Sequence, residues 1–185
     1  EKGDGIKIAM KYHVRAFPSY LIFTPEGKLL YKIAGYQAPE DFMKTMTAAL
    51  DKKNQMNYPT AFDKLDLEYP QFYSSLFEVD KKKRKYPKND EVMAYLDTQK
   101  DLFSEVNWNV LSTFELNEKY SEAFLSNMAK YKNLYGSSDV TDKLNDIISR
   151  KVKSASEKKD YKMLDDVLKM VDKYVTENPE REKLV

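Results

Sequence analysis

The alternation of apolar and polar residues predicts a short mixed unit at the start of the chain. A helix begins near Asp4, which can cap it, and must end before Pro18, because the residue before a proline is driven to extended geometry. An unbroken apolar run over residues 20–23 predicts a strand covered on both faces. Residues 24–27 have the composition of a turn, and the alternation over residues 29–33 predicts the second strand of a hairpin. Pro39 then opens a helix over residues 39–50.

The remainder of the chain has helical spacing throughout. The pattern predicts a short helix around Phe72 and a longer one that begins at Asn89 or Asp90 and runs to Val106. Trp108 lies in a second helix or a bent extension, where its neighbours predict that it fills the core. The last three predicted helices begin at Asn117, Asp139 and Asp160, and Gly136 ends the first of them. Starts about twenty residues apart are typical of stacked helical hairpins.

The two patterns meet in a polar segment that ends in a proline. Residues 52–59 therefore predict a boundary between a first domain over residues 1–53 and a second over residues 60–185. The fold class expected is α/β for the first domain, followed by an all-α domain that is helical-repeat-like.

Composition narrows the possible partners. The chain has 185 residues and a net charge of +1, so no overall field attracts it to nucleic acid or to a membrane surface. The basic run at residues 81–85 has no aromatic residue within it, and we interpret it as a solvated loop. No apolar run approaches the roughly 20 residues that span a bilayer. We expect a protein or peptide partner, no nucleic acid and no membrane span.

The most specific pattern lies in residues 12–28. There a helix end is followed by Phe17-Pro18, an apolar strand and the turn over Thr24–Gly27. This stretch resembles the middle of a thioredoxin-like domain, and with its helical extension the chain is similar to secreted thioredoxin-family proteins of Bacteroidetes-type bacteria. The resemblance implies the C-terminal half of a thioredoxin fold, a cis bond before Pro18 and a periplasmic or extracytoplasmic location. It also implies that Phe17 and Pro18 bind substrate through the backbone, although a proline before a strand can equally be only a turn.

The chain contains no cysteine. Thiol-disulfide exchange requires a thiolate, so this chain alone cannot perform it. We interpret it as a fragment or processed form of a thioredoxin-like thiol-disulfide oxidoreductase or isomerase, redox-inactive as it stands, whose Cys-x-x-Cys would lie roughly forty to sixty residues before Pro18. The alternative is a non-catalytic binding or scaffold protein whose helical domain binds a protein partner. An apolar strand cannot remain exposed on both faces, so we expect the incomplete sheet to be completed by another chain, by a domain swap or by the downstream helices. The first two alternatives would produce an oligomer.

His13 is the single histidine of the chain. We expect it to be a surface residue at a helix end, because a metal site needs three or four converging ligands and none accompany it. Neither a hydrolase motif nor a phosphate-binding glycine loop is present in the sequence. The sequence therefore predicts no catalytic residue, no metal site and no cofactor.

Overall fold

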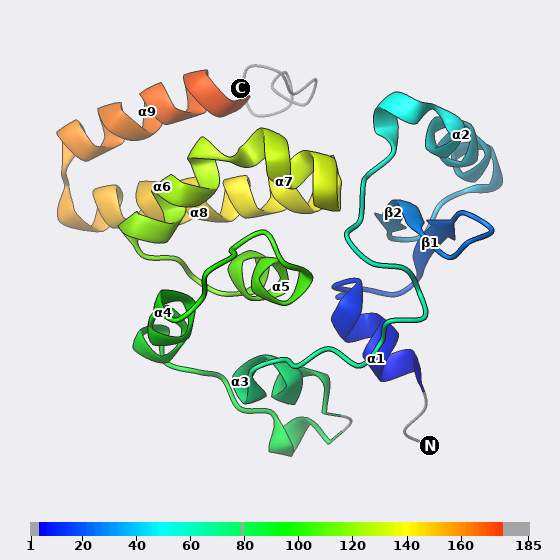
Figure 1. Cartoon of the computed structure of the whole chain (residues 1–185). Coiled ribbons are helices and arrows are strands. Elements are labelled where there is room, and N and C mark those ends of the chain that lie inside the picture. The colour runs from blue at the N-terminus through cyan, green and yellow to red at the C-terminus, as the bar shows by residue number, and fades with distance from the viewer. Residues whose placement is uncertain (1–3, 79, 176–185) are drawn as a thin grey trace.

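The structure is a computed structural model that describes residues 4–78 and 80–175. Helices dominate these residues, and β1 and β2 form a two-stranded antiparallel sheet (Figure 1). In chain order the elements are α1 (Asp4–Lys11), β1 (Ser19–Phe23), β2 (Leu29–Ala34), α2 (Pro39–Leu50), η1 (Lys52–Asn54), α3 (Gln71–Ser74), η2 (Ser75–Phe77), η3 (Lys81–Lys83), α4 (Asn89–Asp97), α5 (Glu105–Thr113), α6 (Glu118–Ser126), α7 (Met128–Tyr135), α8 (Ser137–Lys158) and α9 (Tyr161–Val175).

The first fifty residues have the predicted order of helix, strand, strand and helix. Gly27 closes the hairpin with a φ of 81°, a conformation that glycine adopts without a steric penalty. The two faces of β1 are covered by different parts of the chain. On one face Tyr20 packs against Phe42 of α2, with ring centroids 5.1 Å apart, and on the other Leu21 and Phe23 pack against the main core. The downstream helices therefore supply part of the cover that the strand requires.

The expected long helix from residue 89 to residue 106 is wrong. α4 ends at Asp97, and α5 begins separately at Glu105, after a turn. Two side chains stabilise this turn by hydrogen-bonding to backbone groups that would otherwise bond within a helix. Thr98 Oγ1 donates to the carbonyl of Tyr95, and Asp101 Oδ1 accepts from the backbone N–H of Phe103. Trp108 lies in α5 and is 1% exposed, which confirms the prediction that it fills the core.

The helix expected from residue 117 to Gly136 is also divided. Asn117 caps it as predicted, by accepting a hydrogen bond from the N–H of Tyr120, but α6 ends at Ser126 and α7 begins at Met128. Asn127 lies at the break with a φ of −120°. The pair formed by α8 and α9 follows as a helical hairpin, and Figure 1 shows α6 and α7 beside α8.

The main hydrophobic core is shared by both predicted domains. Trp108 stacks on Tyr131 and Tyr135, with ring centroids 5.0 Å away in each case. The same cluster includes Tyr12 from the end of α1 and Leu29 from β2. Together with residues of the connecting segment 55–70, these side chains join the hairpin to the helices. The domain limits 1–53 and 60–185 stay a prediction, and residues beyond 175 lie outside the described part.

Candidate functional site

The turn at Phe17-Pro18 lies between α1 and β1 and is exposed. Its peptide bond is cis, as the resemblance implies. Phe17 is 86% exposed and Tyr36 is 81% exposed. The backbone N–H of Gly35 donates to the carbonyl of Pro18 at 2.8 Å, and Tyr36 and Phe17 are the chain neighbours of these two residues. Two large aromatic side chains, here named the aromatic pair, thus project from the same end of the sheet.

The outer edge of β1 carries no strand within the described residues, because the sheet there has only two strands. Opposite residues of an antiparallel pair alternate between hydrogen-bonded and non-hydrogen-bonded positions. Since Pro18 is bonded to Gly35, the backbone groups of Ser19 and Leu21 point away from β2. The far edge of β2 differs, because its Leu30 carbonyl accepts from the N–H of Met56 at 2.9 Å. The edge of β1 therefore presents backbone donors and acceptors beside the aromatic pair.

A cleft of about 420 Å³ opens next to this turn, and we name it the charged cleft. It lies between the hairpin unit and the helices, and residues on both sides of Phe17-Pro18 line it. Its wall consists of His13, Val14, Arg15, Ala16, Ser19, Lys32, Ile33, Ala34, Ser112, Thr113, Ser138, Asp139, Asp142, Lys143, Asp146 and Arg150. A pocket of several hundred Å³ is large enough for side chains of a bound peptide.

Most of the charges in the cleft neutralise one another. Lys32 Nζ lies 2.5 Å from Asp139 Oδ2, and Lys143 Nζ lies 3.0 Å from Asp146 Oδ2. Arg150 also pairs with Asp146, with its Nε 2.7 Å from Oδ1. Burial lowers the pKa of Lys143, and the charge of Asp146 offsets this only in part. Burial alone would raise the pKa of Asp139, but contacts with His13 and Lys32 outweigh it and hold that pKa below its usual value.

His13 is not a surface residue, and that expectation is wrong. It is 8% exposed and lies in the turn that follows α1, where its backbone has a φ of 51°. Its Nε2 lies 3.0 Å from Thr113 Oγ1, and its Nδ1 lies 3.3 Å from Ser112 Oγ and 3.6 Å from Asp139 Oδ2. Burial lowers the pKa of the imidazole, against the opposing effect of Asp139. His13 thus joins the end of α1 to α5 and α8.

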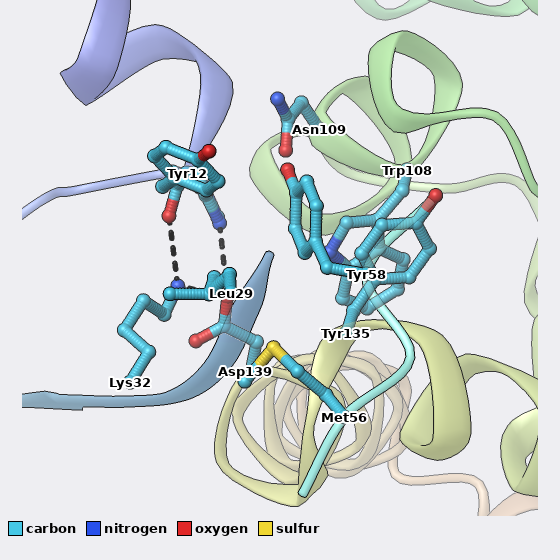
Figure 2. Close-up of a pocket in the computed structure, with 10 residues that line it drawn as sticks. Tyr12, Leu29, Lys32, Met56, Tyr58, Trp108, Asn109, Tyr135 and Asp139 are labelled. Atoms are coloured by element: carbon cyan, nitrogen blue, oxygen red, sulfur yellow. Dashed lines mark hydrogen bonds and ion pairs between the residues drawn. The ribbon is translucent and has the colours of Figure 1, made fainter. Parts of the chain in front are cut away.

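A second, much smaller cavity of about 10 Å³ lies beneath this network. Figure 2 shows Lys32 and Asp139 at one side of it, and Trp108 and Tyr135 at the other. Lys32 Nζ donates to the backbone carbonyl of Tyr12 at 3.0 Å, a bond that fixes the end of α1 on β2. A volume of this size is about that of one water molecule. This cavity is therefore too small to receive part of a polypeptide, whereas the charged cleft is large enough.

Comparisons with protein-family models, curated proteins and solved structures found no match to this chain. Among residues 4–78 and 80–175, no three His, Cys, Asp or Glu side chains converge as a metal site would require. Over the same residues, none of the helices combines the length and the apolar character needed to cross a membrane.

Sequence reasoning singled out Phe17 and Pro18 as the candidate substrate-binding residues, which stays a prediction, and it did not predict the cleft beside them. Asp139 was expected only to begin a helix, whereas α8 begins at Ser137 and Asp139 faces Lys32 across 107 positions of sequence. No local pattern signals a contact of that range. Arg15 could have been noticed, because it precedes the proline turn by two residues, yet its position on the cleft depends on how the turn packs against α8.

Proposed function

We propose that this chain is the substrate-binding half of a thioredoxin-like thiol-disulfide oxidoreductase or isomerase. Phe17 and Pro18 bind an extended segment of a protein substrate. The observation that carries the proposal is the exposure of Phe17 at the end of β1, a strand whose outer edge has no partner in the described residues. An exposed aromatic side chain beside free backbone groups offers an apolar contact and a hydrogen-bonding edge together.

Binding follows the mode in which a peptide adds a strand to a sheet. The substrate backbone pairs with the outward N–H and C=O groups of Ser19 and Leu21, and alternate substrate side chains contact the aromatic pair. The redox step itself needs a thiolate that attacks a substrate disulfide and a second thiol that resolves the mixed disulfide. Since this sequence has no cysteine, both thiols come from another polypeptide segment. A periplasmic or extracytoplasmic location fits that chemistry.

The absence of cysteine also favours a second candidate function, a non-catalytic scaffold. In that case the peptide-binding turn is retained and the helices hold a protein partner. A Cys-x-x-Cys in the gene roughly forty to sixty residues before Pro18 would support the oxidoreductase, and serine or alanine at those positions would support the scaffold. The edge of β1 could alternatively pair with a second copy of the chain, or exchange strands with it, which sedimentation over a range of concentrations would reveal as a dimer.

Peptide binding can be measured by fluorescence anisotropy with fluorescein-labelled, S-carbamidomethylated insulin B chain, whose neutral caps prevent disulfide formation. We expect Phe17→Ala to weaken binding by about fivefold or more, the effect of losing about 1 kcal/mol of apolar contact. Tyr86→Ala is the matched control, because Tyr86 is 78% exposed and lies outside this site. Equal affinities of the two variants would refute the proposal. Neither change should alter the unfolding midpoint, because both side chains are already exposed.

A further inference from the structure

We infer that the charged cleft selects substrates that carry a carboxylate next to the apolar residue bound at Phe17, and that Arg15 binds this carboxylate. The inference rests on the proposed function, since it places the substrate at the same turn. It adds a chemical class to that substrate: an extended peptide with a large apolar residue followed or preceded by an anionic group.

The first step of the argument is position. Arg15 and Ala16 line the cleft on one side of the turn, and Ser19 lines it on the other. A peptide that contacts Phe17 and runs along β1 therefore passes the mouth of the cleft. Successive side chains of an extended peptide point to opposite faces, about 3.3 Å apart along the strand. Phe17 itself is not part of the cleft wall, so when one substrate residue contacts Phe17, the adjacent residue can turn its side chain into the cleft.

The second step is charge. Lys32, Lys143 and Arg150 are each paired with a carboxylate of the cleft wall. Asp142 is engaged as well. Arg15 has neither a hydrogen bond nor an ion pair with any of the residues that the structure describes, and its side chain is exposed. Its guanidinium therefore keeps all five N–H donors available, in a planar arrangement that matches a carboxylate.

The third step locates that charge. The positive charge of Arg15 contributes to lowering the pKa of His13 and the pKa of Lys143, so the guanidinium lies close enough to act on both sides of the cleft. A carboxylate entering the cleft would be attracted by Arg15. The acidic side chains of the wall, Asp139, Asp142 and Asp146, already have partners. A cationic substrate group would meet Arg15 as a like charge. The available electrostatics therefore favour an anion.

The test uses four fluorescein-labelled peptides that share one phenylalanine. The first has Glu next to this phenylalanine and an amidated end, and the second has Gln next to it and an amidated end. The third has an adjacent Gln and a free terminal carboxylate next to the phenylalanine, and the fourth has an adjacent Lys. We expect the Glu peptide or the free-carboxylate peptide to bind about five- to tenfold more tightly than the neutral one, as a charge-assisted bond does, and the Lys peptide to bind worst. The two carboxylate peptides tell whether the anion is a side chain or a chain terminus.

Arg15→Gln should remove the preference for the carboxylate and leave the affinity for the neutral peptide unchanged. Arg15→Lys should retain part of it, because an ammonium keeps the charge but not the planar pair of donors. Lys82→Gln, which removes an exposed positive charge in η3, is the control and should retain the full preference. If Arg15→Gln retains it too, the carboxylate inference fails while Phe17-dependent binding still supports the proposed function. If Phe17→Ala changes the binding of no peptide, the proposed function fails and the inference fails with it.

Discussion

The buried pair Lys11–Glu105 allows a quantitative test of how the hairpin unit is attached to the helices. Lys11 is 0% exposed, and its ammonium donates to Thr60 Oγ1, to the carbonyl of Ala61 at 2.9 Å and to the carbonyl of Lys64 at 2.7 Å. The carboxylate of Glu105 is 3.4 Å away and is 5% exposed. One side chain of α1 thus satisfies acceptors of the connecting segment and a charge of α5.

Replacing Lys11 by Met removes the charge and leaves those acceptors and the Glu105 carboxylate buried. Breaking a buried pair in this way costs about 3–5 kcal/mol, because the remaining charge is uncompensated. For a chain of this length each kcal/mol shifts the midpoint by about 2–4 °C, so we expect a loss of roughly 6–20 °C. The double variant Lys11→Met with Glu105→Leu removes both charges, and we expect it to recover much of this loss, since an apolar replacement of a buried pair is often neutral.

Urea and thermal unfolding can be followed by the fluorescence of Trp108, the single tryptophan, which is buried in the shared core. Lys7→Met is the matched control on the same helix, because Lys7 pairs with Asp66 at the exposed surface and should change the midpoint little. A Lys11→Met variant as stable as Lys7→Met would refute the reasoning. So would a double variant that loses the sum of the two single effects, because a sum without recovery means that the charges do not interact.

Two further predictions concern single positions. Burial lowers the pKa of His13, so the unfolded state binds its proton more readily, and the free energy of unfolding should fall as the pH falls from 7 toward 5.5. His13→Asn should remove this pH dependence in urea titrations, because Asn tolerates the positive φ at this position. An unchanged pH dependence would contradict the role given to His13. Gly136→Ala should destabilise by about 1–3 kcal/mol, because Gly136 has a φ of 88° and a Cβ there would lie 3.0 Å from Met56 Cε. Gly5→Ala in α1 is its control and should stabilise by about 0.5–1 kcal/mol, since open space surrounds Gly5; equal effects of the two changes would show that neither conformation nor space matters at Gly136.

Local rules were sufficient for the hairpin and for most helix starts. The predicted turn at Gly27, the predicted first helical residue Pro39 and the predicted cap Asn117 are all present in the structure. Each of these residues acts within four positions of its own place in the sequence. The same rules failed at Thr98 and Asn127, where side chains bonded to nearby carbonyls end a helix that the apolar spacing would continue. Apolar periodicity does not register such a competition, because the residues that end the helix are polar.

The candidate site was beyond local rules for a different reason. Phe17 and Pro18 were proposed as binding residues from a contiguous pattern, but the cleft beside them is built by contacts such as that of Lys32 with Asp139, 107 residues apart. His13 was misjudged for the same cause: its burial is decided by Ser112 and Thr113, about a hundred positions away. A single sequence specifies such contacts only through the whole fold.

The cleft exists only where the hairpin unit and the helices meet, and this has a consequence for specificity. Its wall takes Arg15 from the turn and Lys143 from α8, so neither part alone could present both. The contacts that fix their separation are polar: Lys32 with Asp139, and His13 with the end of α5. Polar contacts fix geometry more narrowly than apolar packing, because a misplaced buried charge or donor is costly. If the turn binds peptides as proposed, the helical part therefore contributes to substrate selection directly, by forming the second wall of the cleft that receives the substrate side chain.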